Sequence, residues 1–122
     1  MNRWIKRGDI FYIRNERYRT GSEIRKNRPA IIVSNDMNNR YGRVVEVVYL
    51  TSRPKEKDMP THVVIRSTGR RSIALCEQPT AVAIERIENW LGTATAKEMQ
   101  LIDDALLVAL GIEAEKKRGK RR

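Results

Sequence analysis

Short runs of apolar residues, separated by polar turn formers, fill most of the first ninety positions of the chain. Five of these runs are rich in β-branched and aromatic residues: 8–14 (GDIFYIR), 30–34 (AIIVS), 43–51 (RVVEVVYLT), 61–67 (THVVIRS) and 72–78 (SIALCEQ). This composition predicts strands. The third run is apolar enough to predict a strand that is buried, or nearly buried, on both faces. A sixth run at 81–87 (AVAIERI) predicts one more strand or an irregular crossing, after which ENWLG interrupts the pattern.

Three polar segments separate the early runs and are predicted to be loops. Residues 15–27 (NERYRTGSEIRKN) show no apolar period, residues 34–42 (SNDMNNRYG) are dense in turn formers, and residues 52–60 (SRPKEKDMP) contain two prolines. The first segment is longer than most connections in a small domain, and long loops tend to be functional or mobile. Pro29 lacks the amide hydrogen of a sheet ladder, so it fits the start of the second strand.

The period of the apolar positions changes at residue 95. Thr95 to Glu98 (TAKE) have the form of a helix capping box. The apolar residues that follow at helical spacing are Met99, Ile102, Leu106 and Leu110, with Leu101 and Leu107 widening the stripe. Gly111 stands where a C-terminal cap is expected. These signals predict an amphipathic helix that packs on the sheet.

Together the elements predict one mainly β domain over residues 1–112 with a C-terminal helix. Five or six closely spaced strands in so short a chain favour a strongly bent antiparallel sheet or a small barrel. Residues 113–122 form a basic tail that we expect to be disordered.

Charge and cysteine content narrow the function. The formal net charge is +10, and six of the cations lie in the segment 116–122 (KKRGKRR). Such an excess favours a polyanionic partner, most often a nucleic acid, although a solubilising end explains the tail equally well. The single cysteine, Cys76, lies in an apolar run, which predicts a buried, reduced thiol in a cytoplasmic protein.

Several chemistries are disfavoured by the residues present. One histidine and one cysteine argue against a zinc site, so we expect no metal or other cofactor. A nucleophilic pair of Cys76 and His62 is disfavoured because the cysteine lies among apolar residues. Neither an eighteen-residue apolar stretch nor a secretory signal is present, so we expect no membrane association.

Polar residues at strand ends offer a candidate phosphate site. Arg28 stands just before the second predicted strand, and Thr51 and Ser52 end the third. If these strands pair antiparallel, the start of one lies beside the end of the other. A guanidinium supplies a planar fork of donors and each hydroxyl adds one more, which suits a phosphate. The alternative is a surface cation beside an ordinary strand terminator.

Six blocks of sequence then carry a resemblance to a known family. RGDIFYI, GSE, RPAIIVSND, VVYLTS, PTHVVI and ALCEQ occur in this order, and DDALLVALG follows them. Together they resemble the MazF/PemK family of toxin endoribonucleases over roughly residues 6–112. The resemblance implies an SH3-like barrel that forms a homodimer. It also implies metal-independent, sequence-specific cleavage of single-stranded RNA, held in check by a cognate antitoxin protein.

The resemblance also assigns roles to residues. The essential arginine of the family falls on Arg28 and its essential threonine on Thr51, and Ser52 is expected to bond the same phosphate. The implied reaction is attack of the ribose 2′-OH on phosphorus, which gives a 2′,3′-cyclic phosphate and a 5′-OH end. Glu23, in the GSE block, is a candidate to orient Arg28 or to accept the proton, although a loop glutamate is more often simply solvated.

Further RNA contacts are expected in the long loop and in the ALCEQ block. Arg25 and Lys26 would hold the RNA backbone, and Tyr18 would stack on a base; the alternative is a solvated loop whose tyrosine packs on the domain. Gln78 is the candidate from the ALCEQ block.

Two other functions fit the same features. A gyrase-poisoning toxin on the same barrel would cut nothing, but the final helix lacks the aromatic residues that such relatives carry. A non-catalytic nucleic-acid-binding barrel would need only the basic ends of the chain.

Overall fold

Strands dominate the part of the chain that the structure describes. The computed structural model describes residues 4–15, 27–54 and 58–113. Its strands are β1 (Asp9–Ile13), β2 (Arg28–Ile32), β3 (Val44–Thr51), β4 (His62–Ile65), β5 (Ser72–Leu75), β6 (Thr80–Ala83) and β7 (Ile87–Thr93). Its α-helices are α1 (Asp36–Tyr41) and α2 (Ala96–Leu110), and a 3₁₀ turn (Ile84–Arg86) joins β6 to β7.

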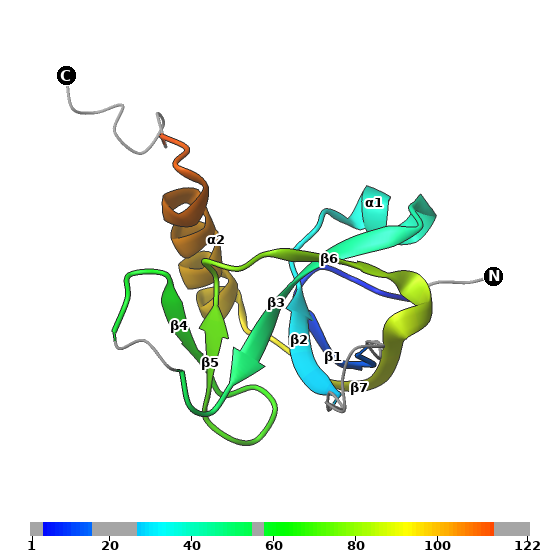
Figure 1. Cartoon of the computed structure of the whole chain (residues 1–122), viewed down its shortest axis with the longest axis horizontal. Helices are drawn as coiled ribbons and strands as arrows, with labels where there is room; N and C mark the ends of the chain where they lie inside the picture. Colours follow the sequence, from blue (N-terminus) through cyan, green and yellow to red (C-terminus); the bar gives the residue numbers. More distant parts are fainter. Residues whose placement is uncertain (1–3, 16–26, 55–57, 114–122) are drawn as a thin grey trace, which may run out of the picture.

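β3 is the central strand, because it pairs with three others. β2 follows one of its edges, while β6 pairs with its first half and β5 with its last two residues along the other. All of these pairs are antiparallel, and the sheet order is β4-β5-β3-β2-β1-β7. β1, β2, β3, β6 and β7 curl round one another, whereas β5 and β4 lead away toward α2 (Figure 1). This is the strongly bent, mainly β fold that the sequence predicts.

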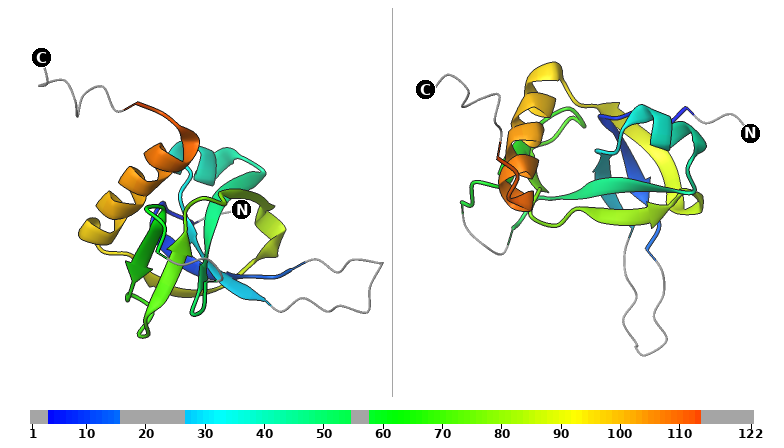
Figure 2. Two further views of the ribbon diagram at one scale, coloured as in Figure 1. Left: turned by 60° about the vertical axis from the view of Figure 1, so that its left-hand side comes forward. Right: turned by 90° about the horizontal axis from the view of Figure 1, so that it is seen from above.

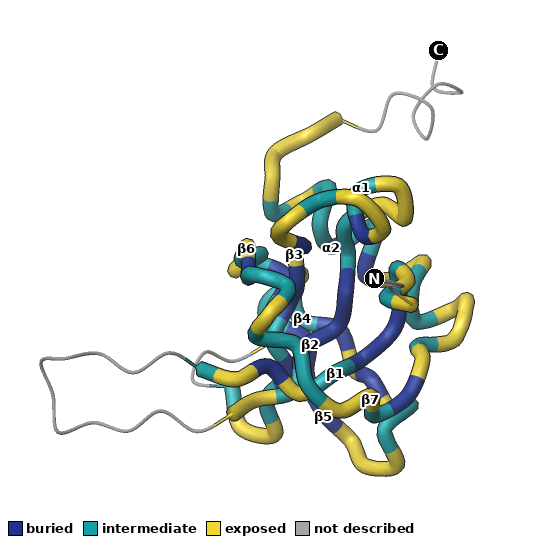
Figure 3. The backbone as a smooth tube through the Cα atoms, turned by 90° about the vertical axis from the view of Figure 1, so that its right-hand side faces the viewer, coloured by how far each residue is buried: buried dark blue, intermediate teal, exposed yellow. Residues whose placement is uncertain are grey.

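The two faces of β3 build two hydrophobic cores. Successive side chains of a strand face opposite sides; Val45 and Val47 lie in the core inside the curled strands, and Val48 and Leu50 lie in the core beneath α2. Figure 3 shows the buried backbone running through these central strands, with the exposed turns outside. Val44 and Glu46 are exposed. The strand therefore buries both of its faces only from Val47 onward, and Val48 is its first residue in the core beneath α2.

Helix α2 lies across the β4–β5 end of the sheet (Figure 2). Its first turn has the predicted capping box: the Thr95 hydroxyl accepts from the Glu98 amide at 3.0 Å, and the Glu98 carboxylate accepts from the Thr95 amide at 2.9 Å. Gly111 ends the helix in the left-handed conformation, as predicted. Ile102 and Ala105 form the fully buried part of its apolar stripe.

The Glu98 carboxylate also ties α2 to the β4–β5 turn. It accepts hydrogen bonds from the Arg66 amide at 2.8 Å and from the Ser67 hydroxyl at 2.5 Å. Partial burial alone would raise the pKa of Glu98, but these bonds and those with Thr95 outweigh it, so the pKa is lowered. One charged side chain therefore caps a helix and anchors a turn.

Three sequence predictions need correction. Residues 36–41 form helix α1 instead of a loop, because the Asn35 side chain caps it by accepting from the Asn38 amide at 2.8 Å. ENWLG does not interrupt the strand pattern but lies within β7, whose irregular register against β1 obscures the alternation. β2 spans 28–32 instead of 30–34.

No helix among the described residues has the length and apolar character needed to cross a membrane.

We predict that Glu98→Ala lowers the free energy of unfolding by about 1–2 kcal/mol, because it removes a capping box and the bonds to the β4–β5 turn. A carboxylate with a lowered pKa stabilises the fold above its unfolded pKa, and this contribution is lost as the pH falls through the folded value. In urea unfolding, the difference from the wild type should therefore shrink below about pH 4. Lys97→Ala, an exposed change on the same turn, is the control. If the difference in the free energy of unfolding between Glu98→Ala and the wild type did not change with pH, this role of Glu98 would be contradicted.

Candidate active site

The pairing of β2 with β3 brings Arg28 beside Thr51. The register of the two strands pairs Ala30 with Tyr49 and Ile32 with Val47, and its extension by two residues sets Arg28 opposite Thr51. Both residues and Ser52 line one pocket of about 650 Å³. The structure thus brings these three sequence candidates together at one edge of the sheet.

The polar lining of this pocket is cationic and rich in hydroxyl groups. It consists of Asn27, Arg28, Thr51, Ser52, Thr68, Arg70 and Ser72. These seven residues carry two guanidinium groups and four aliphatic hydroxyl groups, and no carboxylate or histidine is among the described residues that line the pocket. Such a lining suits an anion with several acceptor oxygens, as a phosphate has.

The Arg28 side chain is held by an aromatic ring. Its guanidinium carbon lies 5.3 Å from the centroid of the Tyr49 ring, which is a cation–π distance. Tyr49 and Thr51 are two residues apart on β3, so their side chains share one face of the strand. The ring therefore supports the guanidinium on the same side as the Thr51 hydroxyl.

The Thr51 hydroxyl is oriented by the turn that follows β3. Its oxygen accepts a hydrogen bond from the Arg53 amide at 3.2 Å. The Arg53 amide uses an acceptor lone pair of this oxygen, so the hydroxyl proton stays available to donate to a ligand.

The β4–β5 turn forms the far wall and was not found from the sequence. It contributes Thr68, Arg70 and Ser72. Glu98 anchors the turn through Arg66 and Ser67, as described above. Gly92 of β7 allows it to lie close, because a Cβ there would stand 2.6 Å from the Ser67 carbonyl oxygen. The only sequence signal was the basic, polar TGRRS segment itself.

An apolar wall completes the pocket. It consists of Tyr12, Pro29, Leu50 and Leu91. Tyr12 and Pro29 are direct partners in the pairing of β1 with β2, and Tyr12 is 38% exposed. The pocket therefore combines a cationic side with an aromatic and aliphatic one.

The remaining predicted site residues lie elsewhere or are not described. Tyr18, Glu23, Arg25 and Lys26 fall outside the described residues. Gln78 is exposed on the turn after β5, where its backbone amide donates to the Leu75 carbonyl at 3.0 Å. It is not among the residues that line the pocket.

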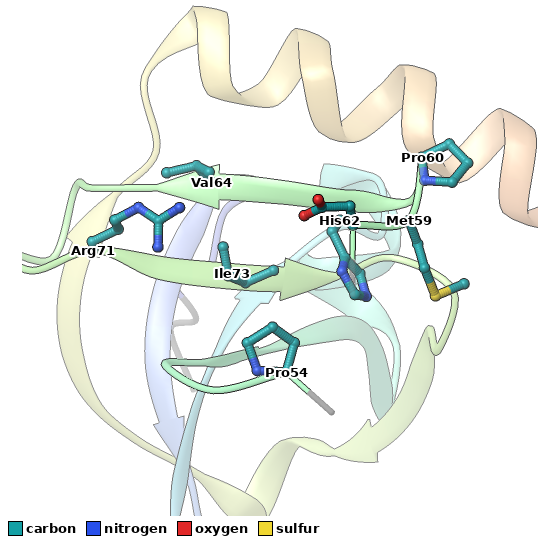
Figure 4. Close-up of a pocket in the computed structure, with 8 residues that line it drawn as sticks. Pro54, Met59, Pro60, His62, Val64, Arg71 and Ile73 are labelled. Atoms are coloured by element: carbon teal, nitrogen blue, oxygen red, sulfur yellow. The ribbon is translucent and has the colours of Figure 1, made fainter. Parts of the chain in front are cut away.

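A second hollow, of about 630 Å³, lies on the outer face of β4 and β5 (Figure 4). It is lined by His62 and Arg71 together with Asp58, so it carries charges of both signs. The His62 ring is already bonded to Glu77 at 3.1 Å. Partial burial alone would raise the pKa of Glu77, but bonds from the backbone, Thr61 and His62 lower it. This hollow is less suited to a polyanion than the Arg28 pocket.

Cys76 is fully buried, as the sequence predicts. Burial, with a smaller effect of the Glu77 charge, raises the pKa of its thiol to about 12. Since the thiolate is the reactive form, Cys76 cannot serve as a nucleophile beside His62. Within the described residues, no three His, Cys, Asp or Glu side chains are grouped closely enough to hold a metal ion.

A family model covers most of the chain. The family model of PemK-like, MazF-like toxins of type II toxin–antitoxin systems matches residues 6–110, most of the chain, and the protein therefore belongs to this family. The resemblance seen in the six sequence blocks is thereby confirmed.

Solved structures share the fold. An endoribonuclease from a mycobacterial species is 25% identical with a TM-score of 0.71, over 87% of this chain and 90% of that one. A mycobacterial endoribonuclease in complex with its cognate antitoxin is 24% identical, with a TM-score of 0.73 over 88% and 96% of the two chains. MazF in a MazE–MazF complex from Deinococcus radiodurans is 22% identical, with a TM-score of 0.75 over 88% and 96%.

We predict that Cys76 does not react with a thiol reagent such as DTNB in the folded protein at pH 8, because its thiol is buried and protonated. The same sample should react with one equivalent once guanidinium chloride unfolds it. Rapid labelling of the folded protein would contradict the buried position and would restore Cys76 as a candidate nucleophile.

Proposed function

We propose that the protein is a toxin endoribonuclease that cleaves single-stranded RNA in the Arg28 pocket. The observation that carries the proposal is the juxtaposition of Arg28 and Thr51 in a cationic, hydroxyl-rich lining with no carboxylate among its described residues. Membership of a toxin family whose structural relatives include an endoribonuclease supports it.

The proposed reaction needs donors more than it needs a metal. The ribose 2′-oxygen loses its proton and bonds to the adjacent phosphorus, the bond from phosphorus to the 5′-oxygen breaks, and that oxygen takes up a proton. The products are a 2′,3′-cyclic phosphate and a 5′-OH end. Charge grows on the non-bridging oxygens in the transition state, and fixed donors that meet it there lower the barrier.

Arg28 and Thr51 are the proposed donors to these oxygens, with Ser52 beside them. The Tyr49 ring and the Arg53 amide hold the two groups before a ligand arrives. A guanidinium does not deprotonate near neutral pH, so Arg28 acts by charge and hydrogen bonding. Glu23 is our candidate for the proton acceptor.

The attacking group explains a preference for RNA, because DNA has no 2′-hydroxyl. The apolar wall of Tyr12 and Leu91 suits a nucleobase, since base stacking on an aromatic ring tolerates any sequence. Tyr18, Arg25, Lys26 and Gln78 remain proposed RNA contacts outside the pocket.

We also propose a cognate antitoxin and a homodimeric assembly. Two of the structural relatives were solved in complex with an antitoxin or with MazE, and dimerisation follows from the family resemblance. We propose that the protein acts in the cytoplasm.

One assay separates this proposal from a gyrase poison and from a non-catalytic RNA-binding barrel. The purified protein is incubated with long single-stranded RNA in EDTA, and fragment ends are mapped by sequencing. Fragments with 5′-OH ends at a recurrent motif support the endoribonuclease. Inhibition of DNA supercoiling without RNA fragments would support the gyrase poison, and RNA retention with neither effect would support simple binding.

We predict that Arg28→Ala and Thr51→Ala each reduce the cleavage rate at saturating RNA by about 10²–10³, because each removes a donor to the transition state. Thr51→Ser keeps the hydroxyl and should recover most of the rate. Arg40→Ala is a matched control, since Arg40 is also an exposed arginine over a tyrosine, 5.7 Å from the Tyr41 centroid. Circular-dichroism melts should match the wild type; an unfolded Arg28→Ala protein would show that Arg28 is structural.

A further inference from the structure

The Arg28 pocket has a second cation that the proposed chemistry does not use. Arg70 lines the wall formed by the β4–β5 turn, whereas Arg28 belongs to the wall formed by β2 and β3. Among the described residues Arg70 has no ion pair or hydrogen bond through its side chain. Two guanidiniums that line one pocket make it favourable for an anion.

The pocket is larger than one phosphate requires. Its volume of about 650 Å³ lies in the middle of the range found for sites that hold whole organic ligands. An RNA strand that enters it brings consecutive phosphates. One of them can meet Arg28 and Thr51 while the next meets the opposite wall.

A buried hydroxyl on the same wall points to a ligand as well. Ser72 is only 9% exposed and lines the pocket. Among the described residues its hydroxyl has no hydrogen-bond partner, although buried polar groups are nearly always bonded. A phosphate oxygen would satisfy this hydroxyl and would meet the Arg70 guanidinium on the same side of the turn.

The wall that carries Arg70 is fixed in advance. Glu98 holds the turn through the Arg66 amide and the Ser67 hydroxyl, and Gly92 lets the Ser67 carbonyl pack directly on β7. Fixed donors lose little freedom on binding, which makes them effective.

We propose that Arg70, with Ser72, binds the RNA phosphate next to the scissile one and so sets which linkage reaches Arg28 and Thr51. Arg70 is a positioning residue in this proposal, which rests on the endoribonuclease function proposed above.

The neighbouring arginine provides the matched control. Ser72, the first residue of β5, lines the Arg28 pocket, while its neighbours Arg71 and Ile73 line the hollow on the outer face (Figure 4). Arg70→Ala and Arg71→Ala therefore remove the same charge from adjacent positions but from opposite faces.

The experiment measures binding and cleavage of a short RNA that carries the mapped cleavage motif. For binding, the nucleotide that supplies the attacking hydroxyl is replaced by its 2′-deoxy form, so no cleavage occurs. We expect Arg70→Ala to weaken binding roughly tenfold and to reduce the slope of log affinity against log salt by about 0.7. Arg71→Ala should change neither, and Arg70→Ala should raise KM more than it lowers kcat.

A neutral methylphosphonate placed at one linkage at a time identifies the phosphate concerned. In the wild type, a methylphosphonate next to the scissile linkage should weaken RNA binding. In the Arg70→Ala protein, the same methylphosphonate should cause almost no further loss of affinity. Equal effects of Arg70→Ala and Arg71→Ala, or a methylphosphonate effect that Arg70→Ala leaves unchanged, would overturn the inference. Absence of RNA cleavage by the wild type would instead count against the endoribonuclease function itself.

Discussion

The pairing of β3 with three other strands is the constraint on which the rest of the structure depends. Its first half pairs with β6 and its last residues with β5, while β2 follows the opposite edge. Each face of β3 supplies a different core, so a shift by one residue would exchange the two sets of buried side chains. The burial of Val47 and Val48 on opposite faces therefore locks the register of β2. That register sets Arg28 opposite Thr51, and the pocket follows from the packing of the core.

The second wall of the pocket depends on contacts that are far apart in the sequence. The β4–β5 turn is held by Glu98 from α2 and by its close approach to Gly92 of β7. The carboxylate that caps α2 thus also positions the turn that carries Arg70. Helix stability and site geometry are linked through a single side chain, while the side chain itself lies outside the pocket lining.

Local signals in the sequence were sufficient for the first wall but not for the second. The apolar runs predict β2 and β3, and antiparallel pairing alone then brings Arg28 toward Thr51. The capping box and Gly111 predict α2 for similarly local reasons. Arg70 and Ser72 could not be found in this way, because their place depends on the pairing of β5 with β3 and on the anchor at Glu98. α1 was missed because the Asn35 cap and the polar residues after it resemble a loop. The full extent of β7 was missed because the register shifts against β1 hide the alternation of apolar and polar residues.

The charge of the pocket connects its folding to its ligand. Two arginines line the pocket with no carboxylate among its described lining residues, and the buried Ser72 hydroxyl has no hydrogen-bond partner within the described part of the chain. A carboxylate bonded to these donors would compete with a phosphate for them. The donors of both walls therefore remain available to an anion, and the RNA phosphates proposed above would bridge them. Because such an anion would bind the folded state and not the unfolded chain, its binding would stabilise the arrangement of strands that creates the site.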